Sequence, residues 1–171
     1  MRDFIKNPLN ITKEIIRVDG LLKEIVTVKD VNGNLIHKIT SPLMVEFNLR
    51  DMFQIIVGSM ILALPVSVTQ EVWELTESMP LVNVLVMSLF SVTFITFYIY
   101  YSFYKGSIRG HALNFIKRVI LTYVLTLATA TFLLTIIVKL PWQADMILTM
   151  KRILFIGLPA SFAATIADSL K

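Results

Sequence analysis

The chain of 171 residues contains no cysteine and only two histidines. Without cysteine it can form neither a disulfide nor a thiolate metal site. It also lacks a glycine-rich phosphate loop, and neither His37 nor His111 lies beside the serine or acid that a catalytic set would need. We therefore expect no enzymatic activity and no bound cofactor.

Charged residues are scarce as well. They make up 16% of the chain against 56% hydrophobic residues, which is too little polar surface for a soluble domain of this length. The composition therefore predicts an integral membrane protein that is embedded in a lipid bilayer. We interpret the net charge of +4 as a determinant of membrane orientation and expect no nucleic-acid partner. The first forty residues lack the apolar core of a signal peptide, so we expect the N-terminus to be retained.

Four apolar runs are long enough to cross a bilayer as helices, at about 20 residues each. The predicted spans are 52–73, 81–101, 119–138 and 146–167, within a transmembrane domain of residues 49–171. Lys151 and Arg152 interrupt the start of the fourth run, which leaves a re-entrant segment as an alternative to a span. The predicted fold class is all-α transmembrane, a four-helix polytopic membrane protein with a small N-terminal cytoplasmic segment.

The distribution of charge predicts the orientation. Lysine and arginine are frequent in residues 1–50 and in the second loop, whereas the first loop carries Glu71, Glu74 and Glu77 without any basic residue. The positive-inside rule then places both termini and the second loop in the cytoplasm, although Lys139 in the third loop opposes the rule. We expect a multi-pass protein of the cell inner (plasma) membrane.

Residues 1–48 form the predicted cytoplasmic segment and contain a β-hairpin pattern. Residues 25–29 and 35–40 alternate in polarity, and Asn32-Gly33 between them is typical of a hairpin turn. A lone hairpin is only marginally stable, so it must pack on residues 4–16, on the membrane surface or on another subunit. Two roles stay open for this segment, a sensor or gate and a cap that assists assembly.

A Leu-Pro-x-Ser element occurs twice in the apolar runs, and an acid follows each serine by seven residues. The first is residues 64–67 with Glu74, and the second is residues 158–161 with Asp168. A proline breaks the helical hydrogen-bond ladder and a carboxylate in lipid is costly, so the repetition favours a function. In the alternative, the proline only bends the helix, the serine hydroxyl caps the carbonyl that the proline frees, and the acids are hydrated.

The candidate ion-pathway residues come from these two elements. In an oligomer, Glu71 and Glu74 would form rings of carboxylates that attract cations, whereas the second element lies among small residues that favour helix packing. The predicted pathway or ion-binding residues are Pro65, Ser67, Thr69, Gln70, Glu71, Glu74, Ser161 and Asp168. The sequence does not decide whether they hold a specific metal ion.

Two segments of the chain resemble an uncharacterised prokaryotic integral-membrane family. Residues 58–73 are similar to the first span of that family, with a Gly-Leu-Pro run that leads to Thr-x-Glu-x-Trp, and residues 158–167 are similar to its last span. The resemblance implies a polytopic membrane protein without a known activity. The residues shared with the family pattern are Pro65, Glu71, Trp73, Pro159 and Ser161.

We interpret the chain as a homo-oligomeric cation channel or channel-like transporter, because four helices alone leave little room for a pathway. Glu71 and Glu74 would form an acidic outer vestibule, with inorganic cations as the transported partners. The alternative is a non-conducting membrane sensor or interaction protein that signals through its cytoplasmic head. A lipid-modifying enzyme is a third hypothesis, which lacks a base beside Ser67 or Ser161.

Overall fold

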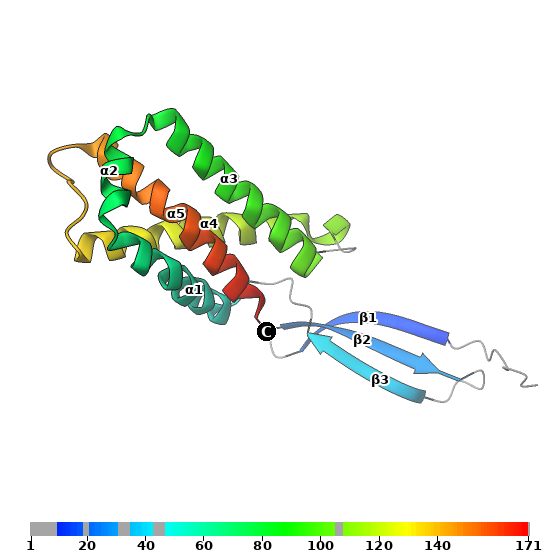
Figure 1. Ribbon diagram of the computed structural model, residues 1–171. Helices are drawn as coiled ribbons and strands as arrows, with labels where there is room; N and C mark the ends of the chain where they lie inside the picture. The colour runs from blue at the N-terminus through cyan, green and yellow to red at the C-terminus, as the bar shows by residue number, and fades with distance from the viewer. Residues whose placement is uncertain (1–9, 19–20, 31–34, 43–46, 105–107, 171) are drawn as a thin grey trace, which may run out of the picture. The chain divides into compact units, whose positions relative to one another are not determined.

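The computed structural model describes residues 10–18, 21–30, 35–42, 47–104 and 108–170. The chain divides into two compact units, Met1–Glu46 and Phe47–Lys171. The first unit is a three-stranded antiparallel sheet in the order β1-β2-β3 (Figure 1). Its strands are β1 (Asn10–Val18), β2 (Leu21–Lys29) and β3 (Leu35–Pro42).

The predicted hairpin is confirmed as β2 and β3. Val28 pairs with His37, and a register shift follows it where Lys29 pairs with Leu35. The predicted turn at Asn32-Gly33 lies outside the described residues. Strand β1 is an addition to the prediction, and it supplies the partner that the hairpin needs because it pairs with β2 along its whole length.

The second unit is helical, and the predicted all-α transmembrane class is confirmed. Within the described residues, four helices are long and apolar enough to cross a membrane. A short helix and one π-helical turn, which extends the second long helix, complete the unit. The elements are α1 (Leu49–Ser67), α2 (Gln70–Ser78), α3 (Leu81–Ile99), η1 (Tyr100–Tyr104), α4 (Ile108–Ile136) and α5 (Met146–Ser169).

The predicted first span, 52–73, covers parts of two helices. Helix α1 ends at Ser67, two residues after Pro65. Thr69 then adopts an extended backbone with φ −85° and ψ 125°, and α2 begins at the next residue. Glu71 and Trp73 therefore belong to α2, not to a membrane-spanning helix. Helix α4, in contrast, begins at Ile108 in polar sequence, well before the predicted boundary at residue 119.

Helix α5 contacts each of the other helices, and its most extensive contact is with α1 (Figure 1). A Cβ atom at Gly58 of α1 would lie 2.5 Å from the Cβ of Ala167 and 2.9 Å from the carbonyl oxygen of Ala163. The two backbones therefore touch, and glycine is required at this position. Small residues at helix contacts are how helices pack in lipid, where burial of apolar surface gives no driving force.

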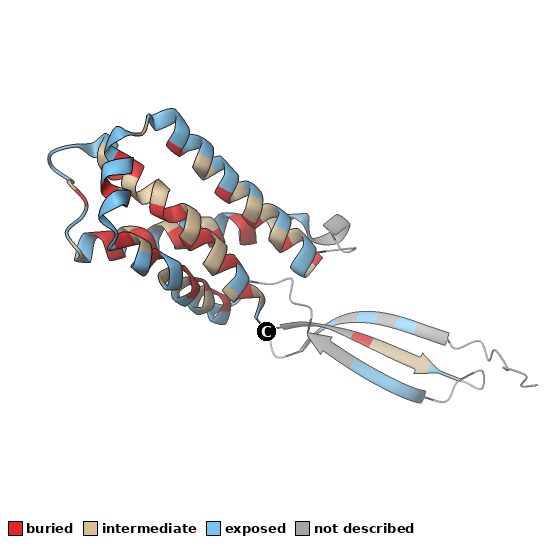
Figure 2. Cartoon of the chain, in the orientation of Figure 1, coloured by how far each residue is buried: buried red, intermediate tan, exposed pale blue. Residues whose placement is uncertain are grey.

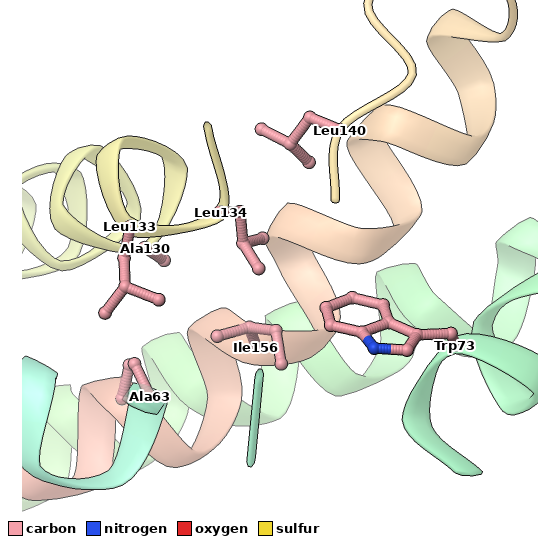
Figure 3. Close-up of a cluster of buried hydrophobic side chains, with 8 residues drawn as sticks. Ala63, Trp73, Ala130, Leu133, Leu134, Leu140 and Ile156 are labelled. Carbon is pink, nitrogen blue, oxygen red and sulfur yellow. The ribbon is translucent and has the colours of Figure 1, made fainter. Parts of the chain in front are cut away.

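Buried and exposed residues lie on different faces of the long helices. Buried residues form inward stripes on the long helices, while large apolar side chains such as Phe53, Phe90 and Phe132 are exposed on the outside (Figure 2). This is the pattern of helices that are surrounded by lipid. The main buried apolar cluster lies where α2 and the loop after α4 close one end of the bundle, which we call the α2 end (Figure 3). It consists of Ala63, Trp73, Ala130, Leu133, Leu134, Leu140, Ile156 and Ala160.

Candidate functional site

Three charged side chains from three different helices meet at the end of the bundle opposite the α2 end. Asp51 lies in the first turn of α1, Arg118 in α4 and Asp168 in the last turn of α5. Their exposed fractions are 1%, 0% and 0%. We call these three residues the charge cluster. Because α1 begins where α5 ends, the cluster also shows that these two helices run antiparallel.

The arginine at the centre of the cluster binds both carboxylates. Arg118 Nη2 donates to both oxygens of Asp168 at 2.8 Å, and Nε donates to Oδ2 at 3.0 Å. The same Nη2 lies 3.3 Å from Oδ2 of Asp51. The ring centroid of Phe103 lies 3.9 Å from the guanidinium carbon, which is a cation–π distance. The guanidinium is thus held by two carboxylates and an aromatic face.

Local helix structure favours one of the two aspartates and disfavours the other. Asp51 accepts a hydrogen bond at 3.1 Å from the backbone N–H of Asn48, the N-cap of α1, and a carboxylate is favourable at a helix N-terminus. Asp168 is in the opposite situation, because the C-terminal end of α5 repels negative charge. The guanidinium of Arg118 therefore stabilises an anion that both burial and the helix dipole disfavour.

Buried hydroxyl groups continue from the charge cluster into the bundle. On α4, threonines follow Arg118 at one-turn spacing on the same face, and serines or threonines of α1 and α5 are buried at 0% exposure as well. We call this set the hydroxyl row: Ser59, Thr122, Thr126, Thr129, Ser161 and Thr165. Five of the six donate to a carbonyl of their own helix, three or four residues earlier. The hydroxyl of Thr122, one turn from Arg118, has no hydrogen-bond partner within the described part of the chain.

The structure divides the eight predicted pathway residues into two groups. Asp168 belongs to the charge cluster, Ser161 belongs to the hydroxyl row, and Ser67 is buried near the α2 end. The other five are exposed on α1, on α2 or between them: Pro65, Thr69, Gln70, Glu71 and Glu74. The two Leu-Pro-x-Ser elements therefore lie in different surroundings, and a role in ion passage stays a prediction for both.

The two serines of these elements make the same local hydrogen bond. Ser67 donates to the carbonyl of Leu64 and Ser161 donates to that of Leu158, both at 2.8 Å. The alternative in which these hydroxyls cap the carbonyls freed by the prolines, four residues before each proline, therefore does not apply. A serine hydroxyl two residues after a proline reaches the carbonyl three residues behind it, which is one turn too late for the freed group.

A second group of charged residues surrounds Trp73 at the α2 end. Arg152 donates to Glu77 Oε1 at 2.7 Å and to the carbonyl oxygen of Lys139 at 2.6 Å. The Arg152 guanidinium carbon and the Lys139 ammonium lie 5.2 Å and 5.4 Å from the indole ring. Val138, with a positive φ of 55°, adjoins them. We call Trp73, Glu77, Lys139 and Arg152 the outer group.

The outer group lines an open hollow of about 560 Å³ that also contains two predicted residues. Gln70 and Glu74 face this hollow and are joined by a hydrogen bond of 3.0 Å from Gln70 Nε2 to Glu74 Oε1. The carboxylates of the predicted vestibule thus share their surroundings with Lys139 and Arg152. No cluster of three histidines or carboxylates suited to a metal ion occurs among residues that the structure describes.

Two members of the charge cluster, Asp51 and Arg118, were not predicted as site residues. Arg118 belongs to a Lys117-Arg118 pair that looks like a positive border of the third span. A signal was nevertheless present, because Arg118, Thr122 and Thr129 fall on one helical face and Lys117 does not. An arginine in line with buried threonines faces a helix partner and not water.

Comparison with known protein families gives one match. A family described as "Putative integral membrane protein (DUF2391)" matches residues 27–168, which run from β2 to the last turn of α5 and include all four long helices and the charge cluster. No curated protein and no solved structure matches the chain. The expected relation to an integral-membrane family is confirmed, and the chain belongs to this family of integral membrane proteins.

Proposed function

We propose that this protein transports cations across the cell inner membrane as a homo-oligomer, with both termini in the cytoplasm. The observation that carries the proposal is the charge cluster, since Asp51, Arg118 and Asp168 are all buried in helices long enough to span a bilayer. Charged groups at such positions are costly and rare, and where they occur they commonly serve ion or proton pathways. The proposal includes no catalytic step.

The arrangement of the cluster suits a change of state driven by a cation. Arg118 is shared between carboxylates on two helices, so a proton or metal cation that binds one carboxylate weakens the attraction of Arg118 for it. Arg118 can then stay with the other carboxylate. Because α1, α4 and α5 each contribute one member, a change of pairing would be transmitted to three helices.

The hydroxyl row supports a path that leads away from the cluster along α4. Hydroxyl oxygens and ordered water are ligands for hard cations and carriers for protons, and the Thr122 hydroxyl is available for such a role. There is no room between α1 and α5 at Gly58, where the backbones touch. A path would therefore follow the α4 side of the bundle or an interface between subunits.

Exposed carboxylates at the α2 end support the proposed outer vestibule. Glu71, Glu74 and Glu77 are exposed on α2, beside the hollow of the outer group. Copies of α2 in an oligomer would raise the local cation concentration, and Lys139 and Arg152 would limit this effect near Glu77.

The proposal is tested by ion flux into liposomes that contain the purified protein. We expect passage of cations, loss of most of the flux in Asp168→Asn, and a smaller loss in the double variant Glu71→Gln with Glu74→Gln. Asp168→Glu, which restores the charge, should recover part of the flux. Glu14→Gln, on the exposed surface of β1, is the matched control and should conduct as the wild type does. Wild-type liposomes that stay tight to monovalent cations, calcium and protons at every pH would overturn the proposal.

A non-conducting interaction protein is the second candidate function, and the sheet supports it. Strand β3 exposes three apolar side chains, Leu35, Ile36 and Ile39, with exposed fractions of 60%, 55% and 46%. Exposed apolar residues on an edge strand fit a protein partner. This candidate predicts that Leu35→Ser with Ile39→Ser abolishes capture of a cytoplasmic partner by the full chain, whereas transport predicts unchanged cation flux in that variant.

A further inference from the structure

An apolar groove runs along the outside of the bundle between α1 and α5. One wall is the row Phe53, Val57 and Ile61 of α1, and the other is Ala167 with Leu170 of α5. The floor is the neighbouring α1 row of Arg50, Gln54 and Gly58, whose side chains shorten toward the middle of the helix. Rows at four-residue spacing form ridges on a helix, with a furrow between them. At Gly58 this furrow ends against α5, whose Ala167 lies directly beside the glycine.

The groove has the length of one hydrocarbon chain in one leaflet. From Arg50 to Ile61 it follows eleven residues of helix, about 16 Å, which is half the thickness of a bilayer hydrocarbon core. The lining is almost entirely apolar, apart from Arg50 and Gln54 at one end. An apolar lining of this length suits one acyl chain that runs from the headgroup level to the bilayer midplane.

The mouth of the groove carries an exposed cation. Arg50 is exposed at the start of α1 and makes no ion pair or hydrogen bond with any residue of the described ranges. One turn further along, Gln54 Nε2 donates to the carbonyl of Leu170 at 3.1 Å, while its Oε1 is buried without a hydrogen-bond partner there. A positive group and an unsatisfied acceptor are thus placed at the level where a lipid headgroup meets the hydrocarbon region.

We propose that the α1–α5 groove binds one acyl chain of an anionic phospholipid, with the lipid phosphate at Arg50. A headgroup hydroxyl, as in phosphatidylglycerol, would donate to Gln54 Oε1. The chain would lie against Phe53, Val57 and Ile61 down to the middle of the bilayer. The site does not depend on cation transport, and it is distinct from the charge cluster in the bundle interior.

The test is native mass spectrometry of the full chain in detergent with added phosphatidylglycerol or phosphatidylcholine. We expect one tightly bound phosphatidylglycerol per chain and weaker binding of phosphatidylcholine. Arg50→Gln should lower phosphatidylglycerol binding about fivefold, the effect of one cation near an anionic headgroup. Phosphatidylcholine binding should fall less, because its choline group offsets the charge of the phosphate. Lys117→Gln removes another exposed cation at the same end of the bundle and should change neither.

The groove itself is tested by filling it. Val57→Trp should displace both lipids, whereas Val124→Trp, at a position of similar exposure on α4 (56% against 59%), should displace neither. Equal binding of the two lipids by the wild type, or equal losses in Arg50→Gln and Lys117→Gln, would overturn the proposal. A change of oligomer mass in Val57→Trp with unchanged lipid binding would also overturn it and assign the groove to a second copy of the chain.

Discussion

The two ends of the helical bundle hold arginine and carboxylate in opposite ways. In the charge cluster, the side chains of Arg118 and Asp168 are both fully buried. In the outer group, the Arg152 side chain is 12% exposed and that of Glu77 is 58% exposed. The closest distances are nearly equal, 2.8 Å and 2.7 Å, so the pairs differ in environment and not in contact geometry.

The difference in exposure determines how much each ion pair can contribute to stability. An exposed pair remains partly solvated in either state, and its net effect on stability is small. A buried pair is costly to form because both charges lose solvent, and it is also costly to break because one charge is then left without its partner. Apolar residues at the three positions of the charge cluster would pack the helices equally well. The charge cluster is therefore better explained by a function than by stability.

The largest expected effect is the removal of the central arginine. Arg118→Met leaves the carboxylates of Asp51 and Asp168 buried near each other, and we expect the free energy of unfolding to fall by about 3–5 kcal/mol. Arg152→Met, the matched change in the outer group, should cost less, about 1–2 kcal/mol, because Glu77 stays hydrated and the main loss is the hydrogen bond to the Lys139 carbonyl. Unfolding in increasing dodecyl sulfate, followed by circular dichroism, measures both. Equal losses would show that burial does not distinguish the two ends.

Neutralising the carboxylates should have a smaller effect, and an unequal one. Asp168 accepts from two nitrogens of Arg118 within 3.0 Å, so Asp168→Asn should lower the free energy of unfolding by about 1.5–3 kcal/mol. Asp51 lies at 3.3 Å from Arg118, and asparagine can keep its hydrogen bond from Asn48, so Asp51→Asn should cost less. A double-mutant cycle with Arg118→Met measures each coupling. A larger coupling for Asp51 would contradict the assignment of Asp168 as the main partner.

The comparison also shows what could be predicted from the sequence. Apolar length predicts the four helices, because a bilayer requires about 20 apolar residues whatever their neighbours are. The Asn-Gly pair and the alternating pattern around it predict β2 and β3. The break between α1 and α2 is not predicted, because Val72 and Trp73 extend the apolar run beyond Pro65 and the extended backbone of Thr69 is seen only in the structure.

The candidate site was predicted only in part, for a physical reason. Asp168 was identified because a carboxylate in an apolar run is conspicuous. Arg118 was assigned to a loop border, since charge alone does not reveal whether a side chain turns toward water or toward a neighbouring helix. The direction of the Arg118 side chain depends on which helices surround α4. Sequence periodicity shows which residues share a face of α4, but not which helix packs against that face. The ion pair therefore required the packing of α1, α4 and α5.

The two buried glycines of α1 and α5 extend the comparison to helix packing. A Cβ at Gly58 would meet backbone atoms of Ala163 and Ala164 at 2.9 Å and 3.0 Å, so Gly58→Ala should cost about 1–3 kcal/mol. A Cβ at Gly157 would meet only Leu127, at its terminal Cδ2, 2.6 Å away. Because that methyl group can rotate away, Gly157→Ala should be nearly neutral or slightly stabilising. The same detergent unfolding measures both, and the opposite order would contradict the close contact of α1 with α5.

The smallest expected effect comes from the exposed ion pair, and its salt dependence distinguishes that pair from the buried one. Glu77→Gln should change the free energy of unfolding by no more than about 1 kcal/mol, because Glu77 is largely solvated before and after the change. At 1 M salt the Debye length is about 3 Å, so this small effect should vanish. The effect of Asp168→Asn should persist at 1 M salt, since no counterion reaches a pair at 0% exposure. Salt that weakens both effects equally would mean that water and ions enter the charge cluster, and the contrast between a buried and an exposed ion pair would then be lost.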